Sequence, residues 1–186
     1  MVRKTEVNSS LSREDWLRVA LDVLNERGVD SVKVLPLSKA LGVTRGSFYW
    51  HFKNREDLLQ QMLEYWEWEL TDTVIEHARM LDASAEDKLR DVVTNVLFQS
   101  MDRYDTAVRA WSLFDGSALK TMKRVERKRL RLLAELLNQI GLDQDAAQLR
   151  AQFLYGYLMS GIAVAGRPTQ AEKAGAVDQC MEFILN

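Results

Sequence analysis

The segment from Val43 to Phe52, V-T-R-G-S-F-Y-W-H-F, places hydrogen-bonding side chains beside a run of aromatic ones. Arg45 carries a planar fork of donors that matches the O6 and N7 acceptors on the edge of a guanine. Thr44 and Ser47 carry hydroxyls that can reach a phosphate oxygen or a base edge. As one short helix, the segment would hold these groups at its tip and the aromatic rings at its base. This pattern predicts contact with a groove of double-stranded DNA.

Further polar groups near this segment suit contacts with the phosphate backbone. Tyr49 and His51 carry polar tips on apolar bodies, and Gly46 removes a side chain where the helix would approach the backbone closely. Lys53 and the N–H groups that open a helix after Asn54 are expected to form an anion site. A hairpin that only packs would not need these polar groups, although His51 alone could equally be a structural histidine. The predicted DNA-binding residues are Lys33, Thr44, Arg45, Gly46, Ser47, Tyr49, Trp50, His51 and Lys53.

Three short helices are expected to position this segment. Ser12 and Asp15 resemble a capping box that opens the first helix. The second is predicted from Pro36 to Leu41, because proline is tolerated at the first helical position. The third, from Arg45 to His51, follows a tight turn at Gly42, where glycine suits a left-handed backbone. Their shared core is predicted to contain Trp16, Val19, Ala20, Val23, Leu24, Val34, Leu37, Ala40, Leu41, Val43, Phe48 and Phe52.

The remainder of the chain shows helical periodicity. A long helix is predicted from Arg55 to about Met80, and a later break is expected at Tyr104-Asp105. The chain is therefore predicted to be all-α, with about nine helices. A helix-turn-helix unit is expected at 1–54 and a second helical domain at 55–186. The other predicted helices are 85–103, 106–114, 118–140, 143–165 and 169–185.

Composition and charge narrow the classes of function. The 186 residues are 47% apolar and include only 2 prolines, which is typical of a helical protein with a substantial core. The net charge is −2, but residues 1–55 hold 10 Lys/Arg against 6 Asp/Glu, whereas residues 56–186 hold 15 against 21. A basic front on an acidic body suits a module that faces a polyanion, although this imbalance alone is also within ordinary fluctuation.

The sequence gives little support to a disulfide-rich protein, a metalloprotein, an enzyme or a membrane protein. Cys180 is the only cysteine, and His51 and His77 are the only histidines, so neither a disulfide framework nor a metal site is predicted. The sequence shows no nucleophile–base set and no glycine-rich phosphate loop, so no enzyme, catalytic residue or cofactor is predicted. The polar N-terminus lacks a signal-peptide core, and the longest apolar stretch, 153–166, is 14 residues. A membrane helix needs roughly 20, so we expect a cytoplasmic protein with no membrane partner.

The segment 42–59, G-V-T-R-G-S-F-Y-W-H-F-K-N-R-E-D-L-L, closely resembles the DNA-binding signature of the TetR (tetracycline-repressor) family. The likeness covers 42–59 nearly position by position and 12–60 in pattern. It implies a homodimeric, ligand-responsive transcription regulator whose remaining helices form a divergent ligand-binding and dimerisation domain. One departure is Lys33, which stands where family members commonly open the second helix with Thr or Ser. Lys33 cannot cap in that way, but its ammonium can reach a phosphate.

Aromatic and methionine side chains of the second domain stand where they could line a cavity between helices. Such pockets are mostly apolar with a few polar groups. Trp111 and Phe114 are of most interest because they precede a break at Asp115-Gly116. Ordinary core packing is the alternative for each residue. The predicted pocket lining is Phe98, Met101, Trp111, Phe114, Met122, Tyr155 and Met159.

Two charged rows lie on the predicted long helices. The acidic row could offer a counter-charge to a cationic ligand, and the basic row could form a second contact with a polyanion. In each case the simpler interpretation is a solvated face that pairs with neighbours of opposite charge. The acidic row is Glu64, Glu67, Glu69, Asp72 and Glu76. The basic row is Lys120, Lys123, Arg124, Arg127, Lys128, Arg129 and Arg131.

The last two predicted helices carry more apolar surface than one face can hide in a small domain. Gly156 and Ser160, four residues apart, permit close approach of another helix. Two such helices from each subunit would form a four-helix dimer interface. A two-fold dimer would present two recognition helices about 34–36 Å apart and would read a palindromic operator. The predicted interface residues are Phe153, Tyr157, Leu158, Ile162, Val177, Met181 and Ile184.

These features together predict a sequence-specific DNA-binding transcription regulator. Its partners would be an operator in double-stranded DNA, a second copy of the chain and a small-molecule effector. The favoured interpretation is a repressor that a small apolar ligand releases from a palindromic operator. The alternatives are a ligand-dependent activator and a dimeric helical interaction protein with a vestigial helix-turn-helix.

Overall fold

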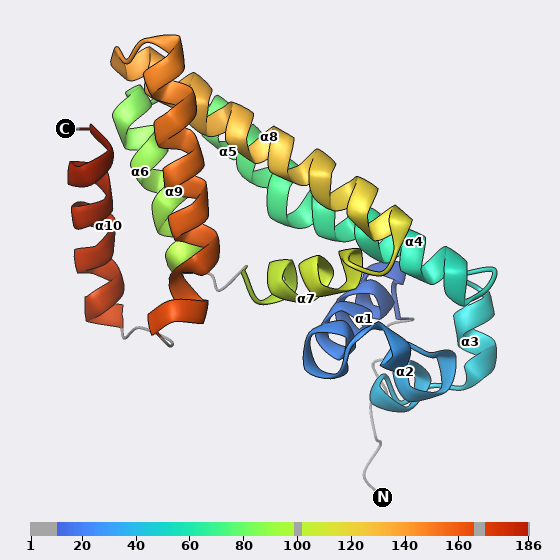
Figure 1. The fold of residues 1–186 in the computed structure, drawn as a ribbon. Coiled ribbons are helices and arrows are strands. Elements are labelled where there is room, and N and C mark those ends of the chain that lie inside the picture. The colour runs from blue at the N-terminus through green and yellow to red at the C-terminus, as the bar shows by residue number, and fades with distance from the viewer. Residues whose placement is uncertain (1–10, 99–101, 166–169, 186) are drawn as a thin grey trace, which may run out of the picture. The chain divides into compact units, whose positions relative to one another are not determined.

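The computed structural model describes residues 11–98, 102–165 and 170–185, and Figure 1 shows them as helices joined by short connections. Within these ranges, side chains at 102–103 and 160–174 lie outside the description. The predicted all-α class is confirmed, and none of the described helices is long and apolar enough to cross a membrane. In chain order the elements are α1 (Arg13–Arg27), a 3₁₀ turn η1 (Val29–Ser31), α2 (Val34–Ala40), α3 (Arg45–Tyr49), α4 (Arg55–Glu67), a π-helical turn η2 (Trp68–Asp72), α5 (Thr73–Met80), α6 (Ala85–Phe98), α7 (Asp102–Ser112), α8 (Gly116–Ile140), α9 (Gln144–Ala165) and α10 (Gln170–Leu185).

The chain divides into two compact units at Tyr65, inside α4. The opening of α4 belongs to the first unit. There the Arg55 guanidinium donates to the carbonyl of Val32 (2.7 Å) and to that of Val29 (2.7 Å). The predicted domain boundary, after Asn54, lies before this division. Helical periodicity shows where α4 begins, but it does not show which core the first turns of α4 join.

The helices of the first unit begin and end through local hydrogen bonds. The capping box of α1 forms as predicted: the Asp15 N–H donates to the Ser12 hydroxyl (3.2 Å), and the Ser12 N–H donates to the Asp15 carboxylate (2.8 Å). Gly28 ends α1 with a φ of 76°. The helix α2 begins at Val34, so Pro36 is its third residue rather than its first. Proline is accepted there because the N–H groups of a first turn lack intrahelical partners.

The core of the first unit is aromatic at its centre. The ring of Phe48 lies 5.6 Å from that of Trp16, edge to face, and 5.2 Å from that of Phe52, and all three side chains are buried. The predicted core is confirmed as buried at Trp16, Ala20, Leu24, Leu37, Phe48 and Phe52. Five predicted core residues are half-buried: Val19, Val23, Val34, Leu41 and Val43. Ala40 is exposed, so its assignment was wrong, and the prediction missed Leu17, Leu21 and Val32, which are buried.

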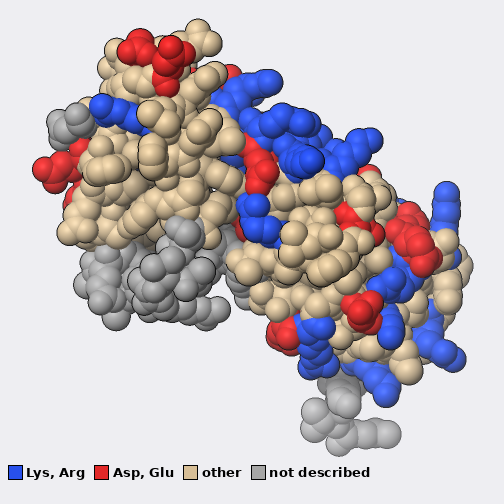
Figure 2. Space-filling view, in the orientation of Figure 1, with Lys and Arg blue, Asp and Glu red and all other residues tan. Residues whose placement is uncertain are grey.

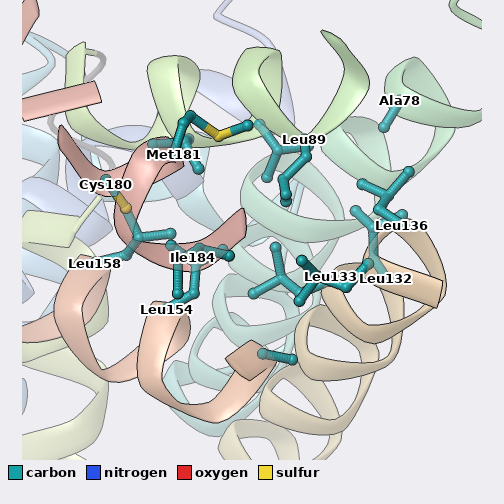
Figure 3. Packing of buried hydrophobic residues seen from close by; sticks show 14 of the residues in the cluster. Ala78, Leu89, Leu132, Leu133, Leu136, Leu154, Leu158, Cys180, Met181 and Ile184 are labelled. Atoms are coloured by element: carbon teal, nitrogen blue, oxygen red, sulfur yellow. The ribbon is translucent and has the colours of Figure 1, made fainter. Parts of the chain in front are cut away.

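Helices α5, α6, α8, α9 and α10 enclose the core of the second unit. Figure 3 shows Leu89 of α6, Leu133 of α8, Leu154 of α9 and Met181 of α10 converging on one cluster. Each of these side chains is at most 3% exposed. Full burial of such a side chain stabilises a fold by about 1.5–3 kcal/mol, so this cluster holds the five helices together.

Two helix boundaries of the second unit differ from the prediction. The helix expected over 55–80 is interrupted by η2, in which the Thr73 N–H bonds to the carbonyl of Trp68, five residues back. The break expected at Tyr104-Asp105 is wrong, because both residues lie inside α7. Asp105 is buried there because it has buried hydrogen-bond partners, which local sequence does not reveal.

Candidate nucleic-acid interface and ligand cavity

The helix α3 turns polar side chains outward and fixes its other side in the core. Thr44 occupies the N-cap position, as predicted, but its hydroxyl makes no capping hydrogen bond. Thr44, Arg45 and Gly46 are all exposed, while Phe48, one turn further on, is completely buried. The side chains with the greatest hydrogen-bonding capacity therefore lie on the open first turn of a helix that its aromatic base holds in place.

Two large aromatic side chains extend the exposed surface of α3. Trp50 is 88% exposed and Tyr49 is 62% exposed. Adjacent exposed rings on one short helix offer flat apolar area together with an indole N–H and a phenol hydroxyl. Such a pair suits contact with thymine methyl groups, sugars and phosphates.

Ser47 and His51 are half-buried, so their exposure lies between that of the open first turn of α3 and that of the buried Phe48. The imidazole of His51 lies 6.5 Å from the Trp16 ring and 6.2 Å from the Phe52 ring, measured between centroids. His51 thus packs against the aromatic core and also keeps an accessible edge. The structural and the phosphate-contact interpretations of this histidine are compatible.

The anion site expected at the start of α4 is reduced by local hydrogen bonds. The Asp57 N–H donates to the Asn54 side chain (2.8 Å), and the Lys53 N–H donates to the Asp57 carboxylate (2.8 Å). The bond from the Lys53 N–H lowers the pKa of Asp57 below its usual 3.8, so this carboxylate is negative at neutral pH. The exposed ammonium of Lys53 remains available to a phosphate. Lys33, also exposed, is the N-cap residue of α2 without a side-chain cap.

A small cavity of about 40 Å³ lies within the second unit, bordered by η2, α5, α6, α7, α8 and α9. Of the residues predicted to line a pocket, Tyr155 and Met159 lie on it. The lining is formed by Leu70, Thr71, Val74, Ile75, Val92, Val96, Asp105, Arg129, Leu132, Leu133, Tyr155, Leu158 and Met159.

The other predicted pocket residues lie elsewhere. Phe114 is 92% exposed just after the end of α7, so its assignment to an internal pocket was wrong. Trp111 and Met122 are buried but do not line the cavity, in keeping with the alternative of core packing. Phe98 packs against the core cluster, also away from the lining. Met101 lies outside the described residues.

The charged pair of the cavity, Arg129 and Asp105, is fully hydrogen-bonded. The guanidinium donates to both carboxylate oxygens of Asp105 (2.5 and 3.2 Å). It also donates to the Thr71 hydroxyl (2.9 Å) and the Leu70 carbonyl (3.2 Å), while the Trp66 indole donates to Asp105 (3.0 Å). Burial alone would lower the pKa of Arg129, but the charge and the hydrogen bonds of Asp105, together with the effect of nearby Tyr155, raise that pKa. Local sequence does not predict this pair, because its members are 24 residues apart.

Some members of the two charged rows on the long helices pair with one another. Glu67 is buried, and its carboxylate bonds to the Arg124 guanidinium and to the Lys128 ammonium (2.9 Å), which also pairs with Asp72 (2.6 Å). Burial alone would raise the pKa of Glu67, but hydrogen bonds from Arg124 and Lys128 hold it below its usual 4.5. Figure 2 shows Lys and Arg side chains gathered along α8. For Arg124, Lys128 and Arg129 the simpler interpretation, pairing with neighbours of opposite charge, is confirmed.

The predicted dimer-interface residues fall into two groups. Phe153 and Tyr157 are 61% and 44% exposed and line an open groove beside α9 and α10. Phe183 and Leu149, which were not among the predicted interface residues, line the same groove and are 76% and 55% exposed. The side chain of Ile162 lies outside the description. Four predicted interface residues are buried in the protomer core, and of these Ile184 also borders the groove: Leu158, Val177, Met181 and Ile184.

The helices α1 to α3 define a helix-turn-helix unit at the front of an all-helical chain. Residues 17–62 match the family model described as bacterial regulatory proteins, tetR family. The match covers the helix-turn-helix unit and most of α4, so this front segment is of the tetR-family type. A transcriptional regulator from Legionella pneumophila, described as TetR, shares the fold with a TM-score of 0.77 at 16% identity, over 97% of this chain and all of that one.

Two curated relatives show how the likeness is distributed along the chain. The regulator AcrR of Shigella flexneri is 34% identical over 97 residues, which are 52% of this chain and 45% of AcrR. The regulator BetI of Proteus mirabilis is 25% identical over 95% of this chain and 93% of its own length. The chain thus matches less than half the length of AcrR, and the likeness that extends over the second unit is weaker.

Proposed function

We propose that this chain is a homodimeric DNA-binding repressor of the TetR family that a small apolar ligand releases from a palindromic operator. The observation that carries the proposal is the two-sided character of α3. Thr44, Arg45, Tyr49 and Trp50 are exposed, while Phe48 on the same helix is completely buried. In helix-turn-helix units the first residues of the second helix meet base edges in the major groove.

Each exposed residue has a role that its chemistry supports. Arg45 would donate two hydrogen bonds to one guanine, which is the commonest specific contact in protein–DNA complexes. Thr44, Ser47, Tyr49 and His51 would bond to phosphate or a base edge. We also propose contacts with the DNA backbone for Trp50, Lys33 and Lys53. Gly46 would allow α3 to approach the DNA backbone closely.

The groove beside α9 and α10 supports a dimer of this chain. Phe153, Tyr157, Phe183 and Leu149 together form a large exposed apolar surface. Figure 2 shows the visible surface over α9 and α10 to be mostly uncharged. Apolar patches of this kind are typical of protein–protein interfaces. A two-fold dimer would bury the same surface of both copies and would present two α3 helices to one operator.

Release by a ligand requires that the ligand bind better to a form of the dimer that no longer fits DNA. The cavity in the second unit supports such coupling because of its size. Its volume of about 40 Å³ is far below the roughly 300–1,000 Å³ of ordinary ligand pockets. A ligand can therefore enter only if the surrounding helices move apart.

Fluorescence anisotropy with labelled DNA from the region flanking the gene tests the proposal. At fixed salt, the full chain should bind one fragment at nanomolar concentration and unrelated DNA far more weakly. Arg45→Ala should weaken binding to this fragment by about 1–3 kcal/mol and should relax specificity. Arg131→Ala, an exposed arginine of α8, is the matched control and should bind like the wild type. Unchanged affinity and specificity in Arg45→Ala would contradict the base-reading role.

A further inference from the structure

The cavity of the second unit contains one polar group that no neighbour satisfies. The hydroxyl of Tyr155 is buried and has no hydrogen-bond partner among the described residues. Arg109 and Arg129 lie close to this hydroxyl, but a guanidinium only donates hydrogen bonds, so neither side chain can accept the proton of Tyr155. Buried hydroxyls without a partner are uncommon in native proteins. Since Tyr155 lines the cavity, a molecule that enters can supply the missing partner.

The other polar groups of the lining are already paired. Asp105 and Arg129 bond to each other, and Arg129 also bonds to Thr71. Arg109, near the Tyr155 hydroxyl, is paired with Glu126 (2.8 Å). A charged ligand would have to separate Arg129 from Asp105 and leave one of them buried without a counter-charge, which is strongly unfavourable. The cavity therefore disfavours both anions and cations.

The rest of the lining is apolar and leaves little free volume. Val74, Val92, Val96, Leu132 and Leu158 contribute aliphatic surface from four helices. Figure 3 shows Leu132 and Leu158 among the packed side chains of this core. A ligand that enters must displace well-packed side chains, so a compact molecule is favoured over an extended one.

We propose that the effector is an uncharged, compact, largely apolar molecule with one oxygen atom that accepts a hydrogen bond from Tyr155. Burial raises the pKa of Tyr155 above its usual 10, so its hydroxyl keeps the proton that it donates. This inference rests on the proposed function, because it treats the cavity as the effector site of the regulator. It adds the chemical class of the effector and the residue that recognises it.

Three probes that share a benzene ring separate the possible ligand classes: acetophenone with a carbonyl, ethylbenzene without oxygen, and benzoate with a charge. Binding to the full chain without DNA is measured by the shift in melting temperature and by NMR titration. Acetophenone should bind most tightly, ethylbenzene about tenfold more weakly, and benzoate not at all at the same concentrations.

The variant Tyr155→Phe removes only the hydroxyl. It should lower the affinity for acetophenone about tenfold and leave that for ethylbenzene within about twofold. Its melting temperature without ligand should not fall, because the lost hydroxyl had no partner. The control variant Tyr65→Phe, on α4 and outside the cavity lining, should bind all three probes as the wild type does.

Three results would overturn the inference: no binding of acetophenone, tighter binding of benzoate than of acetophenone, or equal losses for acetophenone and ethylbenzene in Tyr155→Phe. These measurements contain no DNA. A failure here would leave operator binding in the anisotropy titration intact, whereas failure of that titration would instead contradict the proposed regulator.

Discussion

Individual side chains of the first unit differ in the kind of DNA contact that they can make. Arg45, on the first turn of α3, offers a fork of donors that suits one base pair. Lys53 offers a compact charge that suits any phosphate. Both side chains are exposed. The two contacts should respond differently to salt and to operator sequence, because a phosphate contact releases counterions and carries no sequence information.

Lys53→Ala should weaken binding to operator and unrelated DNA by a similar factor. It should also reduce the slope of log K against log salt concentration by about one. Arg45→Ala, in contrast, should lose more affinity for the operator than for unrelated DNA. Titrations at four salt concentrations measure both quantities. A loss confined to the operator in Lys53→Ala would contradict its assignment to a phosphate.

At the scale of single elements, hydrogen bonds from Arg129 join α8 to η2. Arg129 of α8 bonds to the Leu70 carbonyl and the Thr71 hydroxyl of η2, and it neutralises Asp105 of α7. The geometry of the π-helical turn is thus supported by a side chain of another helix. Removal of this side chain would leave the charge of Asp105 buried and unpaired.

Arg129→Met should lower the free energy of unfolding by about 3–5 kcal/mol, the usual effect of removing one member of a buried ion pair. Urea denaturation followed by circular dichroism measures the change. Arg131→Met, on the exposed side of the same helix, should change the free energy by less than about 0.5 kcal/mol. Equal stability of the two variants would show that the Arg129–Asp105 pair does not stabilise the fold.

The ion pairs of Glu67 predict a dependence of stability on pH. Since these pairs lower the pKa of Glu67 in the folded chain, its contribution is present above the usual value of 4.5. The contribution is lost as the pH falls below 4.5 through the lowered pKa. Glu67→Gln should therefore be less stable than the wild type at pH 7, and the difference should shrink in the acid range. A difference that stays constant between pH 7 and pH 3 would contradict this role.

The elements also show what a single sequence can and cannot predict. The α1 cap and the burial of Phe48 were predictable because they depend on local spacing. The burial of Asp105 was not, because Tyr104-Asp105 has the composition of a turn and only distant partners make it helical. Most of the cavity lining was missed for the same reason, and only Tyr155 and Met159 were predicted. Of the residues predicted to be exposed on α9 and α10, Phe153 and Tyr157 are exposed but four others are buried, because apolar residues on two faces of a helix do not reveal which face the protomer buries.

At the scale of the whole molecule, the groove of α9 and α10 should hold two copies of the chain together. Phe153 and Phe183 are the most exposed of the large apolar side chains that line the groove. In a two-fold dimer both copies contribute them, so four phenylalanines would be buried. At about 1.5–3 kcal/mol for each, this burial is a large part of the free energy of a stable dimer.

The double variant Phe153→Glu, Phe183→Glu should therefore be a monomer at concentrations where the wild type is a dimer. Analytical ultracentrifugation measures the two states. Phe114→Glu is the matched control, because Phe114 is 92% exposed and lies outside the groove, and it should remain a dimer. Dissociation of the control, or a dimer in the double variant, would place the interface elsewhere.

DNase I footprinting of the full chain on the DNA flanking its gene tests the central claim most directly. A dimer that inserts two α3 helices should protect two inverted half-sites whose centres lie about one helical turn, 34–36 Å, apart. The Arg45→Ala variant should lose this protection at the same concentration, while Arg131→Ala should keep it. The absence of a discrete footprint, or a footprint that Arg45→Ala leaves unchanged, would contradict the assignment of α3 as the recognition helix of an operator-binding dimer.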